Sequence, residues 1–85
     1  MKVTPQSIAD KNAERVTKNL DHLRIERGWD RNELISVIAP IIGRKFRATA
    51  DRIRHPKMFS LGEIFALAAY FRKPPEWLFT EHGEG

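Results

Sequence analysis

The fold is decided by the stretch LRIERGWDRNEL, residues 23–34, because one helix ends and another begins within it. Gly28 favours the end of the first helix, since glycine readily adopts the left-handed conformation that often follows a last helical turn. Asp30 and Glu33 have the spacing of a capping box, in which each side chain bonds the backbone N–H of the other residue. A second helix is therefore predicted to begin near Arg31.

The capping-box pattern recurs downstream, where Ser60 and Glu63 predict a further helix that runs to Phe71. Pro74 is expected to end that helix, and Pro75 favours the first turn of a last short helix. Both boxes are flanked by apolar residues in the positions of a hydrophobic staple: Trp29 and Leu34 around the first box, and Phe59 and Ile64 around the second.

Upstream of Gly28, apolar residues recur at spacings of three and four positions, as on the buried face of a helix. These residues are Ala9, Ala13, Val16, Leu20 and Leu23. A first helix is predicted here, and either Thr4 with Pro5 or Ser7 would cap its start.

The chain as a whole is predicted to be all-α, because no stretch alternates in the manner of a β-strand. The expected fold is a compact bundle of four to five helices in one domain, residues 7–82, with tails at residues 1–6 and 83–85. The sequence has no cysteine and no apolar stretch long enough to span a membrane. These features predict a soluble, intracellular protein without disulfides or zinc fingers.

The positive charge is concentrated in residues 44–57. This segment holds six basic residues against one acid, a formal charge of +5, whereas the rest of the chain has nine basic and ten acidic residues, a formal charge of −1. Phe46, Ala50 and Ile53 recur at helical spacing and predict the inward face of a helix in this segment. The charged side chains are then predicted to face solvent, which is the pattern expected of a surface that binds phosphates.

A purely structural role for these cations is disfavoured by their place in the helix. Arg44, Lys45 and Arg47 crowd its N-terminus, where the helix dipole is positive and each cation costs about 0.3–1 kcal/mol. A bound phosphate would reverse this cost, because it meets the free backbone N–H groups and the arginines together. The alternative is a solvated charged face without a ligand.

The sequence does not group residues for catalysis or metal binding. His22, His55 and His82 lie far apart and lack the spacing of metal ligands. There is no glycine-rich phosphate loop and no plausible pair of nucleophile and base. We therefore expect no enzyme activity, no cofactor, no metal site and no small-molecule substrate. His55, at the end of the basic helix, is a candidate phosphate contact instead.

Two blocks of the sequence resemble the lambda repressor and Cro-like family of helix-turn-helix proteins, also called XRE-type regulators. Residues 23–34 resemble the stretch that joins helix one to helix two in that family. The block FSLGEIFALAAYF, residues 59–71, followed by PEWLF, residues 75–79, resembles its fourth and fifth helices. The resemblance extends from Val16 to Phe79.

This resemblance implies a sequence-specific transcriptional regulator of Cro or repressor type, which occupies operator sites on double-stranded DNA in the cytoplasm of a bacterium or of a phage host. Helix three would enter the major groove and helix two would cross the backbone. The residues implied to face the bases are Arg47, Ala48, Asp51 and Arg52. The candidates for phosphate contact are Arg31, Arg44, Lys45, Arg54, His55 and Lys57.

Arginine is the side chain best suited to bind guanine O6 and N7 with two hydrogen bonds. Arg47 or Arg52 is therefore a candidate guanine reader, and a phosphate clamp is the alternative role. Asp51 is placed to form an ion pair within its helix, to orient Arg47, or to accept a hydrogen bond from cytosine N4.

The chain departs from the family pattern between Leu34 and Ile53, where it has several more residues than is usual. The surplus is predicted to lengthen the turn around residues 39–43. Gly43 would then cap a helix whose first residue is Arg44.

Two further expectations concern partners. Regulators of this kind read two half-sites, so a homodimer is a candidate assembly, and the exposed part of Trp77, Leu78 and Phe79 is its candidate surface. The competing functional class is a protein-interaction module, such as an antitoxin or antirepressor whose basic helix binds an acidic partner. An RNA-binding adaptor is a third alternative.

Overall fold

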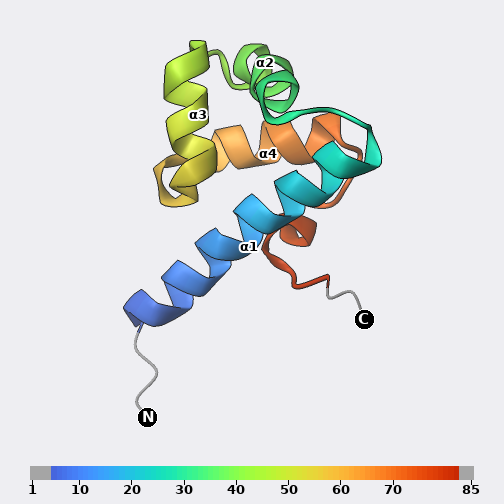
Figure 1. Cartoon of the computed structure of the whole chain (residues 1–85). Coiled ribbons are helices and arrows are strands. Elements are labelled where there is room, and N and C mark those ends of the chain that lie inside the picture. The colour runs from blue at the N-terminus through green and yellow to red at the C-terminus, as the bar shows by residue number, and fades with distance from the viewer. Residues whose placement is uncertain (1–4, 83–85) are drawn as a thin grey trace.

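The computed structural model describes residues 5–82, and all of its regular elements are helices (Figure 1). Four α-helices and two short 3₁₀-helices follow one another: α1 (Pro5–Glu26), α2 (Arg31–Ile42), α3 (Phe46–Arg54), η1 (Pro56–Met58), α4 (Leu61–Tyr70) and η2 (Pro75–Phe79). Residues 5–82 contain no strand, which confirms the predicted all-α class. None of the helices in this range is long and apolar enough to cross a membrane.

Helix α1 begins at Pro5, slightly before the domain boundary predicted at residue 7. The remainder of the predicted tails, residues 1–4 and 83–85, lies outside the described residues. The helix ends before Gly28, whose φ of 70° is the left-handed conformation predicted for it. Three residues of the predicted apolar stripe are buried: Val16, Leu20 and Leu23.

Both predicted capping boxes are formed. The Asp30 carboxylate accepts a hydrogen bond from the backbone N–H of Glu33, and the Glu33 carboxylate accepts one from the N–H of Asp30. Ser60 and Glu63 make the same reciprocal pair at the start of α4. Of the four flanking apolar residues, three are buried, and Trp29 packs partly buried against the core.

Helix α2 is longer than predicted, and the surplus residues belong to it rather than to a loop. It runs through Pro40 to Ile42, and Gly43, at a φ of 67°, is its C-cap rather than the N-cap of α3. The expected long turn around residues 39–43 is therefore wrong, and the connection to α3 consists of residues 43–45. Packing explains the extension, because the isoleucines of the last turn lie against the core while the proline faces solvent.

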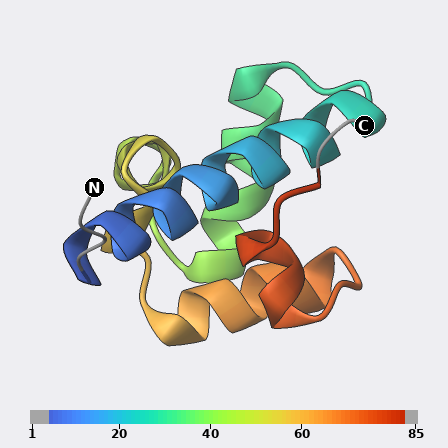
Figure 2. The same ribbon diagram turned by 90° about the horizontal axis from the view of Figure 1, so that it is seen from below.

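The core lies between α1, α2, α4 and η2. Figure 2 shows α4 along one edge of the molecule, with η2 between it and α1, and η2 contacts both helices. The buried apolar residues form one cluster: Val16, Leu20, Leu23, Leu34, Ile38, Phe59, Ile64, Leu67, Ala68, Phe71 and Leu78. The C-terminal segment thus closes the core of the bundle.

One buried side chain fastens the C-terminal segment to α1. The amide nitrogen of Asn19 lies 3.0, 2.7 and 2.9 Å from the carbonyl oxygens of Trp77, Leu78 and Thr80. Leu78 has no exposed area, and Trp77 and Phe79 pack partly buried against the core. The segment suggested as a dimer surface is therefore used largely within the monomer.

Candidate nucleic-acid interface

Helix α3 and the turn before it carry most of the cationic segment. Gly43 lets the chain reverse direction after α2, and α3 then begins at Phe46 with Lys45 as its N-cap. Arg44, predicted as the first helical residue, lies in the turn instead. Helix α3 packs against α2 and α1 and lies at one edge of the molecule (Figure 1).

The inward face of α3 differs from the predicted one. Phe46, expected to be buried, is 46% exposed, whereas Thr49 has no exposed area. The Thr49 hydroxyl donates a hydrogen bond to the carbonyl oxygen of Lys45, so its polar group is satisfied inside the helix. The carbonyl of Ile53, which packs against the core as predicted, accepts a hydrogen bond of 2.8 Å from the Thr17 hydroxyl of α1. Helix α3 therefore turns a small residue toward the bundle, and Phe46 projects at the helix end.

Arg52 faces the bundle, so the prediction that it faces solvent is wrong. Its side chain is only 14% exposed, and its Nε lies 3.5 Å from a carboxylate oxygen of Glu63 on α4. The Arg52 guanidinium also donates a hydrogen bond to the carbonyl of Ala48. Arg44 donates a hydrogen bond to the other oxygen of the same carboxylate. Two of the predicted DNA contacts are thus held by one acid.

Glu63 connects three parts of the structure through its carboxylate. It caps α4 through the backbone N–H of Ser60 and binds Arg44 of the turn and Arg52 of α3, while only 8% of the residue is exposed. Burial alone would raise the pKa of this carboxyl group. The hydrogen bonds from Ser60 and Arg44, with the charges of both arginines, outweigh burial and lower the pKa below its ordinary value. The carboxylate is therefore ionised where it holds α3 in place.

The outer face of α3 begins with Arg47, which is exposed in the first turn as predicted. No acidic group of residues 5–82 lies within ion-pair distance of it. Asp51, one turn later, pairs with Arg54 at 3.0 Å, which confirms the predicted ion pair within the helix. Ala48 is half-buried at the border of this face. Arg47 is thus the arginine of α3 whose guanidinium remains available.

The remaining phosphate candidates are distributed around α3. Arg31 is the first residue of α2, exposed and without an acidic partner in the part of the chain that the structure describes. Lys45 is exposed at the start of α3, and His55 is exposed at its end. Lys57 forms an ion pair with Asp10 of α1. The sequence offered no signal for that pair, because the two residues are distant along the chain.

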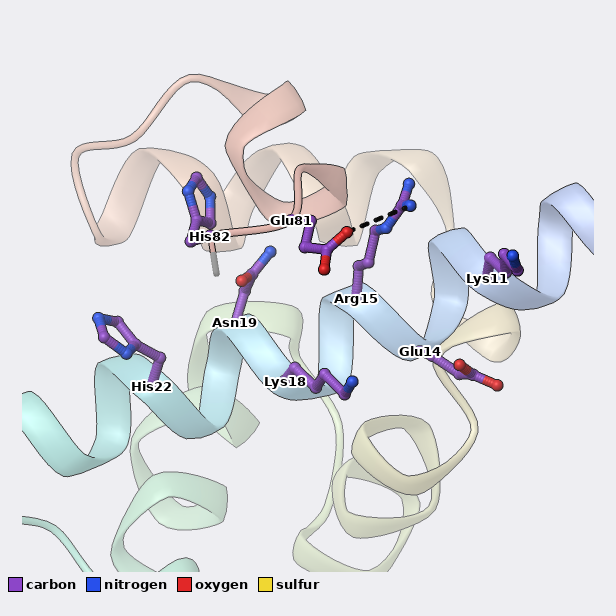
Figure 3. A pocket seen from close by; sticks show the side chains of 8 residues that line it. All are labelled: Lys11, Glu14, Arg15, Lys18, Asn19, His22, Glu81 and His82. Atoms are coloured by element: carbon purple, nitrogen blue, oxygen red, sulfur yellow. Dashed lines mark ion pairs between the residues drawn. The ribbon is translucent and has the colours of Figure 1, made fainter. Parts of the chain in front are cut away.

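A separate hollow lies between α1 and the C-terminal segment (Figure 3). Its lining residues are Lys11, Glu14, Arg15, Lys18, Asn19, His22, Glu81 and His82. Arg15 and Glu81 form a 3.8 Å ion pair across it, and the His82 ring stacks on Trp77. Among residues 5–82 no group of three or more potential ligands is placed to hold a metal ion. Arg15 pairs with Glu81, and the side chains of Asn19 and His82 lie within hydrogen-bond distance of backbone carbonyls, so we assign no ligand to this hollow.

Comparisons with protein-family models, with curated proteins and with solved structures found no match. The function is inferred below from the geometry of α3 and of the residues that hold it.

Proposed function

We propose that the protein is a sequence-specific DNA-binding transcriptional regulator of Cro or repressor type. It would bind operator DNA with α3 in the major groove and α2 across the backbone, and thereby control access to a promoter. The supporting observation is the cationic start of α3. Lys45 and Arg47 flank a helix N-terminus that has no side-chain cap, and neither has an ion-pair partner within residues 5–82.

The residues at the start of α3 destabilise the free helix and favour binding of a polyanion. The first N–H groups of a helix have no acceptor within the helix, and Lys45 supplies none from its side chain. The helix dipole is positive at the same point and disfavours the cations there. A phosphate group offers acceptors and negative charge together. Among polyanions, double-stranded DNA has a major groove wide enough to admit an α-helix.

Arg47 is the residue that we assign to base reading. It lies in the first turn on the outer side of α3, the region from which a recognition helix reaches base edges. Its guanidinium can donate two hydrogen bonds to guanine O6 and N7. Ala48 and Asp51 border it and would shape the contact. Arg52 supports α3 through Glu63 and is therefore assigned to the scaffold.

The experiment begins with selection of bound duplexes from a random library, followed by affinity measurements on the selected site. Arg47→Ala should cost about 1–3 kcal/mol and relax the preference at one base pair. Arg31→Ala should weaken binding to all sequences evenly, because phosphate contacts carry no sequence information. Lys11→Ala removes an equal charge from an exposed position of α1 and should leave the affinity nearly unchanged.

Two outcomes would contradict this proposal. Loss of binding to any competitor duplex alike would leave only non-specific attraction between charges. A wild-type affinity for the selected site in Arg47→Ala would show that α3 is not the reading element.

The second candidate is a protein-interaction module, and exposed Phe46 favours it. This aromatic ring is 46% exposed between Lys45 and Arg47, a combination that would suit an acidic protein with an apolar pocket. Tight binding to such a protein, together with no retention of any selected duplex, would replace the DNA-binding proposal with this one.

A further inference from the structure

Two arginines share the Glu63 carboxylate unequally. One carboxylate oxygen, Oε2, accepts a hydrogen bond from Nε of Arg44. The other oxygen, Oε1, accepts one from the backbone N–H of Ser60 and lies 3.5 Å from Nε of Arg52. This distance is too long for a good hydrogen bond, and the buried Nε of Arg52 has no hydrogen-bond partner among residues 5–82. The carboxylate therefore makes its directional bond to Arg44, while Arg52 contributes its charge.

Arg44 is held at one edge of its guanidinium and is open at the other. Its side chain is 41% exposed, and the bond from Nε to Glu63 is the only hydrogen bond that the guanidinium makes within residues 5–82. The two terminal nitrogens carry the other N–H donors. An arginine fixed by a carboxylate has already lost part of its side-chain freedom, so it loses less when it binds a ligand. The guanidinium is thus ordered in advance and keeps an edge for a second anion.

The cluster also keeps a positive charge for that anion. Two guanidinium groups face one carboxylate, +2 against −1, so a formal charge of +1 remains. The side chain of Arg52 is only 14% exposed, so the excess charge is presented to solvent by Arg44. Lys45 and Arg47 come next along the chain, are both exposed, and have no ion-pair partner within residues 5–82. An anion that approaches the start of α3 therefore meets three cations, and an acid holds the first of them in place.

We infer that Glu63 is a positioning residue for phosphate recognition. It holds Arg44 by Nε, and the two terminal nitrogens of Arg44 then donate hydrogen bonds to one phosphate group beside the start of α3. A guanidinium edge matches two oxygens of a phosphate, which a single ammonium nitrogen cannot do. The inference rests on the proposed function and deepens it. It assigns Arg44 to a backbone phosphate of DNA and gives Glu63 a role in binding besides its role in the stability of α3.

The first test uses inorganic phosphate, so it does not depend on DNA. The Nε–H signal of Arg44 is followed by NMR while phosphate replaces chloride at constant ionic strength. In the wild type this signal should shift saturably with phosphate, and in Glu63→Gln the shift should be much smaller. Glutamine replaces one of the two acceptor oxygens by a donor, so either the Ser60 N–H or Arg44 Nε loses its partner. No phosphate-specific shift at Arg44, or an undiminished shift in Glu63→Gln, would overturn the inference.

The second test measures affinity for the selected DNA site. Glu63→Gln removes a negative charge, so charge alone predicts tighter binding to DNA. The inference predicts the opposite: affinity should fall about three- to tenfold, for the selected site and for unrelated duplexes alike, because a phosphate contact carries no sequence information. Glu33→Gln removes the same charge in the other capping box and should not weaken binding. Arg44→Lys keeps the charge but offers one nitrogen, so it should lose nearly as much affinity as Arg44→Ala.

The double variant separates positioning of Arg44 from a general effect on α3. Glu63→Gln should add little to Arg44→Ala, since the side chain that it positions is already absent. An equal loss in both backgrounds, tighter binding by Glu63→Gln, or a wild-type affinity in Arg44→Lys would overturn the inference. Circular dichroism verifies that the variants are folded, and Arg44→Lys tests the pair without removing the buried acid. Absence of DNA binding with the phosphate response intact would refute the proposed function and leave the positioned phosphate contact standing.

Discussion

Glu63 shows how one side chain can serve both folding and the presentation of a binding surface. Its carboxylate caps α4 and pairs with Arg44 of the turn before α3 and with Arg52 of α3. A buried carboxylate is tolerated when hydrogen bonds and opposite charges replace the water it has lost. The same contacts tie α3 and the turn before it to α4.

Replacement of Glu63 by glutamine should destabilise the fold by about 1–3 kcal/mol, because the largely buried Arg52 and the partly exposed Arg44 lose their counter-charge. Glu33→Gln is the matched control. Glu33 occupies the same position in the capping box of α2, but it is exposed and has no arginine partner among residues 5–82. Urea unfolding should give a clearly smaller loss for Glu33→Gln. Equal losses would mean that Glu63 matters only as a cap.

The stability of the fold should fall in acid partly because of Glu63. Its pKa is lowered in the folded state, so its contribution is present above the ordinary value of 4.5 and is lost as the pH falls through the lower, folded pKa. The difference in unfolding free energy between the wild type and Glu63→Gln should therefore shrink below about pH 4.5. Thermal unfolding over a pH series measures it. A difference that stays constant down to pH 3 would contradict the assigned contacts.

Helix α3 depends on neighbouring elements for part of its stability. It begins without a side-chain cap and has Lys45 and Arg47 where acids would stabilise it. It is held from outside by Glu63 and by the hydrogen bond from Thr17 to Ile53. Because other elements hold α3 in place, its exposed side chains are not needed for stability and are available to a ligand.

Lys45→Ser should stabilise the protein while weakening its proposed binding to DNA. Serine accepts a hydrogen bond from the free N–H groups of the first turn and gains about 0.5–2 kcal/mol over a residue that cannot cap. Lys45→Ala removes the same charge without adding an acceptor and should gain less. Unfolding curves and affinities of both variants are compared with the wild type. A serine variant less stable than the alanine variant would mean that the start of α3 is not a standard N-terminus.

Two glycines in helical surroundings should respond oppositely to alanine. Gly43 has a φ of 67°, so Gly43→Ala should cost about 1 kcal/mol through backbone strain, although nothing lies within 4 Å of the added Cβ. Gly62 lies within α4, and its Cβ would meet only Ser60 Oγ at 4.0 Å. Gly62→Ala should therefore gain about 0.5–1 kcal/mol. Urea unfolding distinguishes these signs, and a stabilising Gly43→Ala would contradict its role as the C-cap of α2.

At the scale of the whole molecule, the sequence predicted the local features and missed those that depend on distant partners. Both capping boxes and the stop at Gly28 were predictable because their chemistry involves residues three or four positions apart. Which side of α3 faces the bundle was not predictable in this way. It depends on a pairing between Arg44 and Glu63, which are 19 positions apart, and on the side of α3 that the bundle covers.

The end of α2 was predicted wrongly for a related reason. Pro40 and Gly43 indicate a loop when only neighbouring residues are considered. Burial of the apolar residues around the proline extends the helix through it, since tertiary packing overrides local propensity. For the candidate site, too, local features were predicted and features that depend on distant residues were missed. The location of the basic helix and the exposure of Arg47 were predicted correctly, whereas the placement of Arg52 required the fold.

Asn19→Ala should release the C-terminal segment from α1. Asn19 is only 5% exposed, and its loss leaves the carbonyl groups of Leu78 and Thr80 without their side-chain donor, at a cost of about 1–3 kcal/mol. The Trp77 carbonyl still accepts a hydrogen bond from the backbone N–H of Thr80. Hydrogen exchange should accelerate at Leu78 and Thr80. Asn12→Ala is the control on the same helix, because that amide only accepts a 3.3 Å bond from Arg15. Unchanged exchange at the C-terminal segment in Asn19→Ala would show that hydrophobic contacts alone hold it.

The inward turn of Arg52 limits how this protein can be re-engineered. A combinatorial library at residues 47, 48 and 51 would diversify the outer surface of α3 and keep the architecture intact. Randomising position 52 as well would destabilise many clones, because most replacements remove one of the two arginine charges that face the buried Glu63 carboxylate. A change of binding specificity should therefore be sought by varying three positions of α3 rather than four.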